Sequence, residues 1–124
     1  MPRDPADRLR DIVEACERIA GYIEDFDFRG FRVDSKTSDA VIRQFEIIGE
    51  AVKALPDDLT DREASVPWRQ IAGFRDVLAH TYFAVDDSII WDAAANKAPQ
   101  LLAACRRLLA ESDRKGFGAD GPVE

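Results

Sequence analysis

Ten residues from Gly73 to Tyr82, GFRDVLAHTY, combine an arginine with the only histidine of the chain. The guanidinium of Arg75 is suited to bidentate contacts with phosphate groups. The imidazole of His80 can change its protonation state near neutral pH, as a general acid or base must. This one motif therefore contains a candidate phosphate ligand and a candidate proton-transfer group.

Arg75 stands where an apolar side chain is expected. At 100° per residue, a helix through this stretch gathers its apolar side chains in one continuous arc, and Arg75 projects into the middle of it. A lone buried guanidinium is strongly unfavourable. Arg75 is thus expected to pair with a buried acid, to face a cleft or to lie at a subunit interface. The helical wheel alone, meaning this projection at 100° per residue, leaves all three open. The arc consists of Trp68, Ile71, Ala72, Phe74, Leu78, Ala79 and Tyr82.

Asp76 and His80 are four residues apart, so they are neighbours on a helix. The carboxylate could hold the imidazole in the tautomer and orientation that a general base needs. The alternative is an ordinary exposed histidine with a helical partner. Arg75 and His80 diverge by about 140° on an ideal helix, so they converge only if the helix deforms or a second protomer contributes. A two-fold dimer would place two copies of each in one groove.

The elements around this motif are predicted to be helices, because apolar residues recur at spacings of three and four along most of the chain. Residues 25–38 and 56–67 are predicted to be connections, and no strand pattern is present. On the second helix, Arg43, Glu46 and Glu50 are placed to support each other along the outer face. The predicted helices run from about Pro5 to Phe26, Val41 to Leu55, Val66 to Thr81, and from Asp86 or Asp87 to Leu109 with a break or kink at Pro99.

These segments predict an all-α fold, a four- or five-helix bundle over residues 1–112, followed by a tail at 113–124 that is expected to be disordered. The length of 124 residues suits a single domain. The net charge of -7 argues against a protein that coats nucleic acid nonspecifically, although a local cationic site remains compatible with it.

Two cysteines, Cys16 and Cys105, fall on apolar helix faces, which indicates buried free thiols in a reducing compartment. The N-terminus has no apolar secretory segment, and no apolar run approaches the roughly 20 residues of a membrane span. The sequence therefore predicts a cytoplasmic protein that does not enter the membrane.

No cofactor is expected. Gly116, Gly118 and Gly121 spell GxGxxG, but a dinucleotide site needs a strand before this motif and a helix after it. The chain has one histidine and no CxxC pair, so it lacks the usual ligands of di-iron and zinc sites. Catalysis is expected to be metal-independent, or to use a metal held mostly by carboxylates and substrate.

The motif and its surroundings resemble a known family. RDVLAH fits the pattern of HEPN domains, and RDVLAHTY fits the narrower Arg-x4-His-x-Tyr form of the HepT toxins. The flanking segments RQFEIIGEAVKALP, PWRQIAGFRDVLAHTYFAVD and IWDAAANKAP are similar to the same family. The resemblance extends from about Asp4 to Leu109, which is most of the chain.

This resemblance implies a helical HEPN bundle that forms a two-fold homodimer, with the motif lining a cleft at the dimer axis. It further implies a metal-independent endoribonuclease that acts on RNA. By position in the motif, Arg75 would bind the scissile phosphate, His80 would be the general base and Asp76 would orient it. Arg69 could add a phosphate contact, although exposed salt bridging is the more common role for such an arginine.

The resemblance also implies a partner. HepT-like toxins are paired with MntA, a nucleotidyltransferase antitoxin that transfers AMP from ATP to the motif tyrosine, which is Tyr82 here. The chain would then be the toxin of a toxin–antitoxin system, inhibited by adenylylation. The alternatives are a non-catalytic HEPN binding module that only docks a nucleotidyltransferase and, after it, a purely structural bundle.

Overall fold

The computed structural model describes residues 4–80 and 86–114, and within these ranges it leaves the side chains of 79, 80, 113 and 114 undescribed. Every regular element in the two ranges is a helix, which confirms the predicted all-α bundle. The elements are α1 (Pro5–Ile23), α2 (Phe28–Val33), α3 (Ser35–Lys53), α4 (Asp57–Thr60), the 3₁₀ helix η1 (Asp61–Glu63), α5 (Trp68–His80), α6 (Asp87–Asp92), the π-helical turn η2 (Ala93–Lys97) and α7 (Ala98–Arg114).

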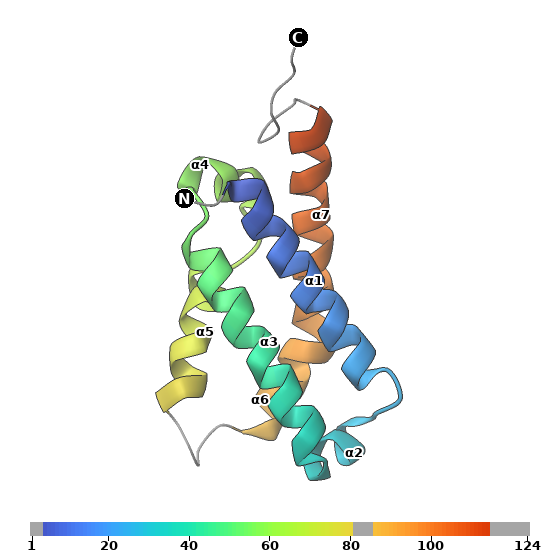
Figure 1. Ribbon diagram of the computed structural model, residues 1–124. Coiled ribbons are helices and arrows are strands. Elements are labelled where there is room, and N and C mark those ends of the chain that lie inside the picture. Colours follow the sequence, from blue (N-terminus) through green and yellow to red (C-terminus); the bar gives the residue numbers. More distant parts are fainter. Residues whose placement is uncertain (1–3, 81–85, 115–124) are drawn as a thin grey trace.

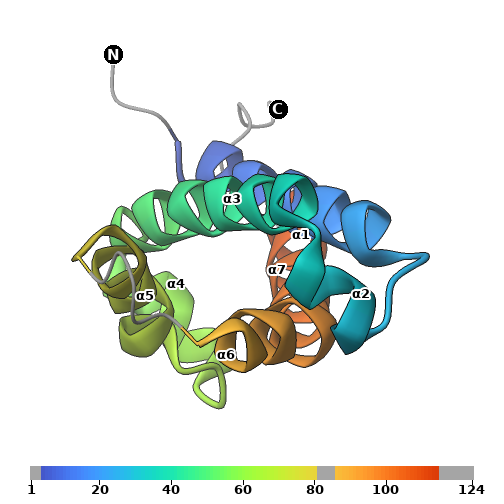
Figure 2. The ribbon, with the colours of Figure 1, turned by 90° about the horizontal axis from the view of Figure 1, so that it is seen from below.

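Three long helices, α1, α3 and α7, form the centre of the bundle. The helices α1 and α3 lie side by side and run in opposite directions, and α7 packs against α1 (Figure 1). The helix α5 packs on α3 at the flank away from α7 (Figure 2). None of the described helices combines the length and apolar content needed to cross a membrane. The side chains buried most fully in the core include Leu9, Ile12 and Ile19 of α1, Val41 and Ile48 of α3, and Cys105 and Leu108 of α7.

Local signals in the sequence explain where α1 begins. The side chain of Asp4 accepts a hydrogen bond from the backbone N–H of Ala6 at 2.9 Å, and Pro5 occupies the first helical position. The helix ends at Ile23, three residues before the predicted Phe26. The predicted start is therefore confirmed, and the predicted end is slightly too late.

The predicted connection at 25–38 is partly wrong, because it contains α2 and the first turn of α3. Two aspartates cap these helices. Asp27 accepts from the backbone N–H of Gly30 at 2.9 Å, and Asp34 accepts from that of Thr37 at 3.1 Å. Each cap satisfies an N–H that has no partner inside its helix, so helices can begin in a segment with little apolar periodicity.

The predicted loop at 56–67 is also partly helical, since α4 and η1 lie within it. This segment also fixes the start of α5 through hydrogen bonds to Trp68. The indole N–H of Trp68 donates to the backbone carbonyls of Thr60 and Glu63, both at 3.1 Å. The helix accordingly begins at Trp68, two residues after the predicted Val66.

The break predicted at Pro99 is confirmed as the π-helical turn η2. In this turn the backbone N–H of Ala98 donates to the carbonyl of Ala93, five residues earlier. Proline has no N–H, and its ring clashes with the carbonyl four residues before it, here that of Ala95. The wider π register just before Pro99 continues the chain into α7 without ending the helical run.

The two cysteines lie in the core as free thiols, as predicted. Cys16 is on α1 and Cys105 is on α7, and both side chains are almost completely buried. Burial raises the pKa of each thiol to about 12. Both thiols are therefore protonated at neutral pH and serve as small apolar packing groups.

Candidate functional site

Arg75 is only half-buried and pairs with an exposed acid on the neighbouring helix. Its Nε lies 3.2 Å from Oε1 of Glu50 on α3, and its Nη1 lies 3.9 Å from Oδ1 of Asp76. The side chain of Arg75 is 42% exposed and that of Glu50 is 59% exposed. The interpretation of Arg75 as half of a buried ion pair is therefore wrong for this chain.

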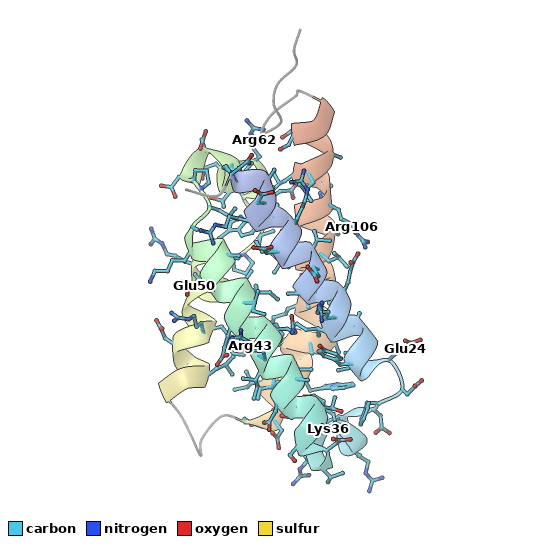
Figure 3. All side chains as sticks on the ribbon, in the orientation of Figure 1. Glu24, Lys36, Arg43, Glu50, Arg62 and Arg106 are labelled. Atoms are coloured by element: carbon cyan, nitrogen blue, oxygen red, sulfur yellow. The ribbon has the colours of Figure 1, made fainter. Side chains whose placement is uncertain are left out.

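The structure fits the second alternative, since Arg75 borders an open cleft of about 410 Å³ between α1, α3 and α5 that is lined mostly by charged residues. Figure 3 shows two residues of this cleft, Arg43 and Glu50, on the same helix, with Glu50 at the side next to α5. The described residues contain no group of three or more His, Cys, Asp and Glu side chains that could hold a metal ion. We call this site the Arg75 cleft, lined by Arg8, Asp11, Arg43, Glu46, Ile47, Glu50, Ala51 and Arg75.

Gly49 explains how the stem of Arg75 fits against α3. A Cβ atom at Gly49 would lie 2.8 Å from the Cβ of Arg75 and 3.4 Å from the carbonyl oxygen of Ala72. The first distance is shorter than two carbon atoms tolerate without movement. The missing side chain of Gly49 therefore allows α5 to approach α3 closely enough for Arg75 and Glu50 to meet.

The apolar side of α5 faces a second cleft, with a volume of about 460 Å³. No described side chain of α5 is fully buried, although its apolar residues pack against the core. Phe74 packs edge-to-face on Phe45 of α3, with ring centroids 5.4 Å apart. The apolar arc seen on the wheel is therefore only partly covered within the described residues. This apolar cleft is lined mainly by Phe45, Ile48, Pro67, Ile71, Phe74, Ile89, Ala93, Ala98 and Leu101.

The other predicted site residues are placed only in part. His80 is the last residue of α5, but its side chain is outside the described part of the chain, as is all of Tyr82. Asp76 is 71% exposed and lies beside Arg75. Its predicted contact with His80 stays a prediction, because the side chain of His80 is outside the described part of the chain. Arg69 is exposed and lines a different hollow at the start of α5, which it shares with Trp68.

Glu50 and Gly49 are the site residues that the sequence interpretation missed. Glu50 was expected to support Arg43 and Glu46 along one face of the helix. The expected pair of Arg43 with Glu46 is confirmed at 3.6 Å, but Glu50 reaches across to Arg75 on α5. Gly49 could have indicated the close approach of another helix. A glycine inside a helix is destabilising by roughly 1 kcal/mol relative to alanine, and a close packing contact often explains why a glycine is present.

Comparisons with known proteins find similar ribonucleases over most of the chain. The family described as "Ribonuclease HepT-like" matches residues 12–108. The "Putative RNase MJ0127" of Methanocaldococcus jannaschii is 46% identical over 91 residues, 73% of this chain and 75% of that protein. The "Probable ribonuclease HepT" of Thermococcus cleftensis is 43% identical over 101 residues, 82% of this chain and 92% of the relative. No solved structure matches the chain.

Proposed function

The chain belongs to the HepT-like ribonuclease family, and we propose that it is an endoribonuclease whose active site contains Arg75 and His80. The observation that carries this proposal is the position of Arg75 at the edge of an open cleft lined mostly by charged residues, where its side chain is 42% exposed. A guanidinium at such a place can bind a phosphate from solution with charge-assisted hydrogen bonds.

In the proposed reaction, His80 removes the proton from an RNA 2′-hydroxyl, and the 2′-oxygen attacks the adjacent phosphorus. A bond from phosphorus to the 2′-oxygen forms, and the bond to the 5′-oxygen of the next nucleotide breaks. The His80 of a second protomer gives a proton to this leaving oxygen. Imidazole can fill both roles because its ordinary pKa of about 6.5 lies near neutral pH. Arg75 binds the phosphate as negative charge develops on its oxygens.

We further propose that the active form is a two-fold homodimer with α5 near the axis. Two observations support this arrangement. The apolar residues of α5 are only partly covered within the described residues, and Val77 on the same helix is 50% exposed. Arg75 and His80 diverge by about 140° on one ideal helix, so groups from two protomers complete the site more easily than groups from one.

The proposed biological role is that of a toxin in the cytoplasm. Its partner would be an MntA-type nucleotidyltransferase that transfers AMP from ATP to Tyr82. The hydroxyl of Tyr82 would attack the α-phosphorus of ATP, pyrophosphate would leave, and the hydroxyl proton would pass to solvent. The attached phosphodiester is anionic and bulky, so it would compete with RNA phosphate for Arg75.

The ribonuclease proposal is tested by incubating the purified protein with RNA in the presence of EDTA. We expect cleavage to continue without metal ions and to leave 2′,3′-cyclic phosphate and 5′-hydroxyl ends, as mass spectrometry of the fragments can show. A protein that binds the nucleotidyltransferase but leaves RNA intact would instead be a docking module. The dimer is tested separately by light scattering at micromolar concentration, where a monomer alone would contradict it.

Adenylylation is tested by incubating the protein with the nucleotidyltransferase and ATP, then mapping modified peptides by mass spectrometry. Wild-type protein should gain adenylyl groups on Tyr82 and lose its ribonuclease activity. Tyr82→Phe should gain none and stay active in the presence of the partner. Equal inhibition of both proteins would show that the partner inhibits by binding alone.

A further inference from the structure

Resting on the proposed function, we infer that Glu50 is a positioning residue that holds the guanidinium of Arg75 in the orientation needed to bind the scissile phosphate. The two residues come from different helices, α3 and α5, and meet at 3.2 Å between Glu50 Oε1 and Arg75 Nε. Both line the Arg75 cleft.

The geometry of this contact suits a positioning role. A guanidinium carries five N–H donors in a rigid planar fork. The carboxylate of Glu50 forms its ion pair at Nε, the base of the fork, where Oε1 lies 3.2 Å away. Near the other end of the fork lies Asp76, whose Oδ1 is 3.9 Å from Nη1, beyond ordinary hydrogen-bond length. The terminal Nη donors can therefore bind a phosphate while Glu50 still fixes the plane of the guanidinium.

The energetics argue that Glu50 contributes little to the stability of the fold. Exposed ion pairs are typically worth about 0–1 kcal/mol, because water screens the charges and two long side chains lose freedom. Both partners here are well above one-third exposed. A stabilising role would therefore be small, and the fixed orientation of Arg75 is the larger consequence of the pair.

Gly49 strengthens the inference, because it stands next to Glu50 and determines how closely the two helices approach. Its absent side chain leaves room for the Cβ of Arg75, which would otherwise lie only 2.8 Å from the new atom. Gly49 and Glu50 together thus define both the distance and the orientation of Arg75 relative to α3.

The experiment measures RNA cleavage by Glu50→Ala, Glu50→Gln and a control, Glu17→Ala. Glu17 is a matched control because it is 52% exposed, pairs with Arg106 on another helix and lies outside the Arg75 cleft. We expect Glu50→Ala to lower kcat about tenfold with KM within about twofold, because a misplaced group acts mainly on the transition state. Glu50→Gln keeps an oxygen acceptor for Nε and should retain activity within about threefold of wild type. Glu17→Ala should cleave RNA as wild type does.

The same substitution in an Arg75→Ala background separates positioning from a direct role. If Glu50 acts through Arg75, adding Glu50→Ala to Arg75→Ala should change the residual rate less than about twofold. Full activity of Glu50→Ala, or an equal loss in both backgrounds, would overturn the inference. If wild-type protein cleaves RNA and Arg75→Ala does not, the proposed function stands even when this inference fails. If wild-type protein does not cleave RNA, the proposed function itself fails.

Discussion

Among the arginines that pair with glutamates on other elements, Arg75 and Arg107 differ in the geometry of the pair. Arg107 of α7 donates two hydrogen bonds to the carboxylate of Glu63 of η1, from Nε at 3.0 Å and from Nη2 at 2.8 Å. Glu63 is only 16% exposed. Arg75 meets Glu50 through one nitrogen, and both of these side chains remain open to solvent at the rim of a cleft.

The difference shows how the same two residue types serve different purposes. The hydrogen bonds from Arg107 hold the pKa of Glu63 below its usual range, and the carbonyl of Glu63 accepts the indole N–H of Trp68 at the start of α5. This pair therefore secures the turn that leads into α5. The Arg75–Glu50 pair leaves donors available, which suits a site that must receive a ligand.

The largest expected effect concerns His80, because the proposed reaction needs its proton transfer. We expect His80→Ala to lower the RNA cleavage rate at least about a hundredfold, the usual range for loss of a general acid or base. Circular dichroism should show unchanged helix content, and the variant should no longer be toxic to cells. An unchanged cleavage rate would contradict the proposed reaction, and with it the catalytic role that separates Arg75 from Arg107.

Arg107→Ala should change stability and leave chemistry intact. Loss of its hydrogen bonds to Glu63 should destabilise the fold slightly and lower the Tm by a few degrees. RNA cleavage below the Tm should stay within about twofold of wild type, since Arg107 lies outside the Arg75 cleft.

The stability difference should also depend on pH in a definite direction. Glu63 has a lowered pKa in the folded protein, so its contribution is present above the ordinary glutamate pKa of about 4.3. That contribution is lost as the pH falls through the lower folded value. The Tm gap between wild type and Arg107→Ala should therefore close in acid, and a gap that widens there would contradict this account.

Among substitutions of the three proposed active-site residues, Arg75, Asp76 and His80, the smallest loss of activity is expected for Asp76→Asn. Asp76 is 71% exposed and, in the proposed mechanism, it orients a neighbouring group and does not itself accept the proton. We expect a loss of cleavage of about threefold to tenfold, below the range for a general base. A loss as large as that of His80→Ala would assign Asp76 a direct role in proton transfer.

The sequence predicted the fold more fully than the site. Apolar periodicity located α1, α3, α5 and α7, because each packs a stripe of apolar residues against the core and the spacing of that stripe is visible in the chain. It missed α2 and α4, which are too short to show a period and depend on their surroundings or on a cap such as Asp27. The π-helical form of the break near Pro99 likewise depends on packing that no periodicity encodes.

For the site, the sequence singled out Arg75 as anomalous but could not identify its environment. The wheel treats all apolar positions as buried, whereas the apolar residues of α5 are only partly covered in the described bundle. Glu50 lies 25 positions before Arg75, so their contact depends on how α3 and α5 pack and is invisible to local spacing. Gly49 held the one local signal of that close approach.

The most direct test of the central claim is the RNA cleavage rate of Arg75→Ala, measured beside its Tm and beside Arg107→Ala. If Arg75 binds the scissile phosphate, Arg75→Ala should lose at least about a hundredfold in rate, comparable to the loss of an oxyanion donor. Its Tm should stay within about 2 °C of wild type, because an exposed ion pair adds little stability. Undiminished cleavage by Arg75→Ala would contradict the claim, as would a loss of activity that only follows unfolding.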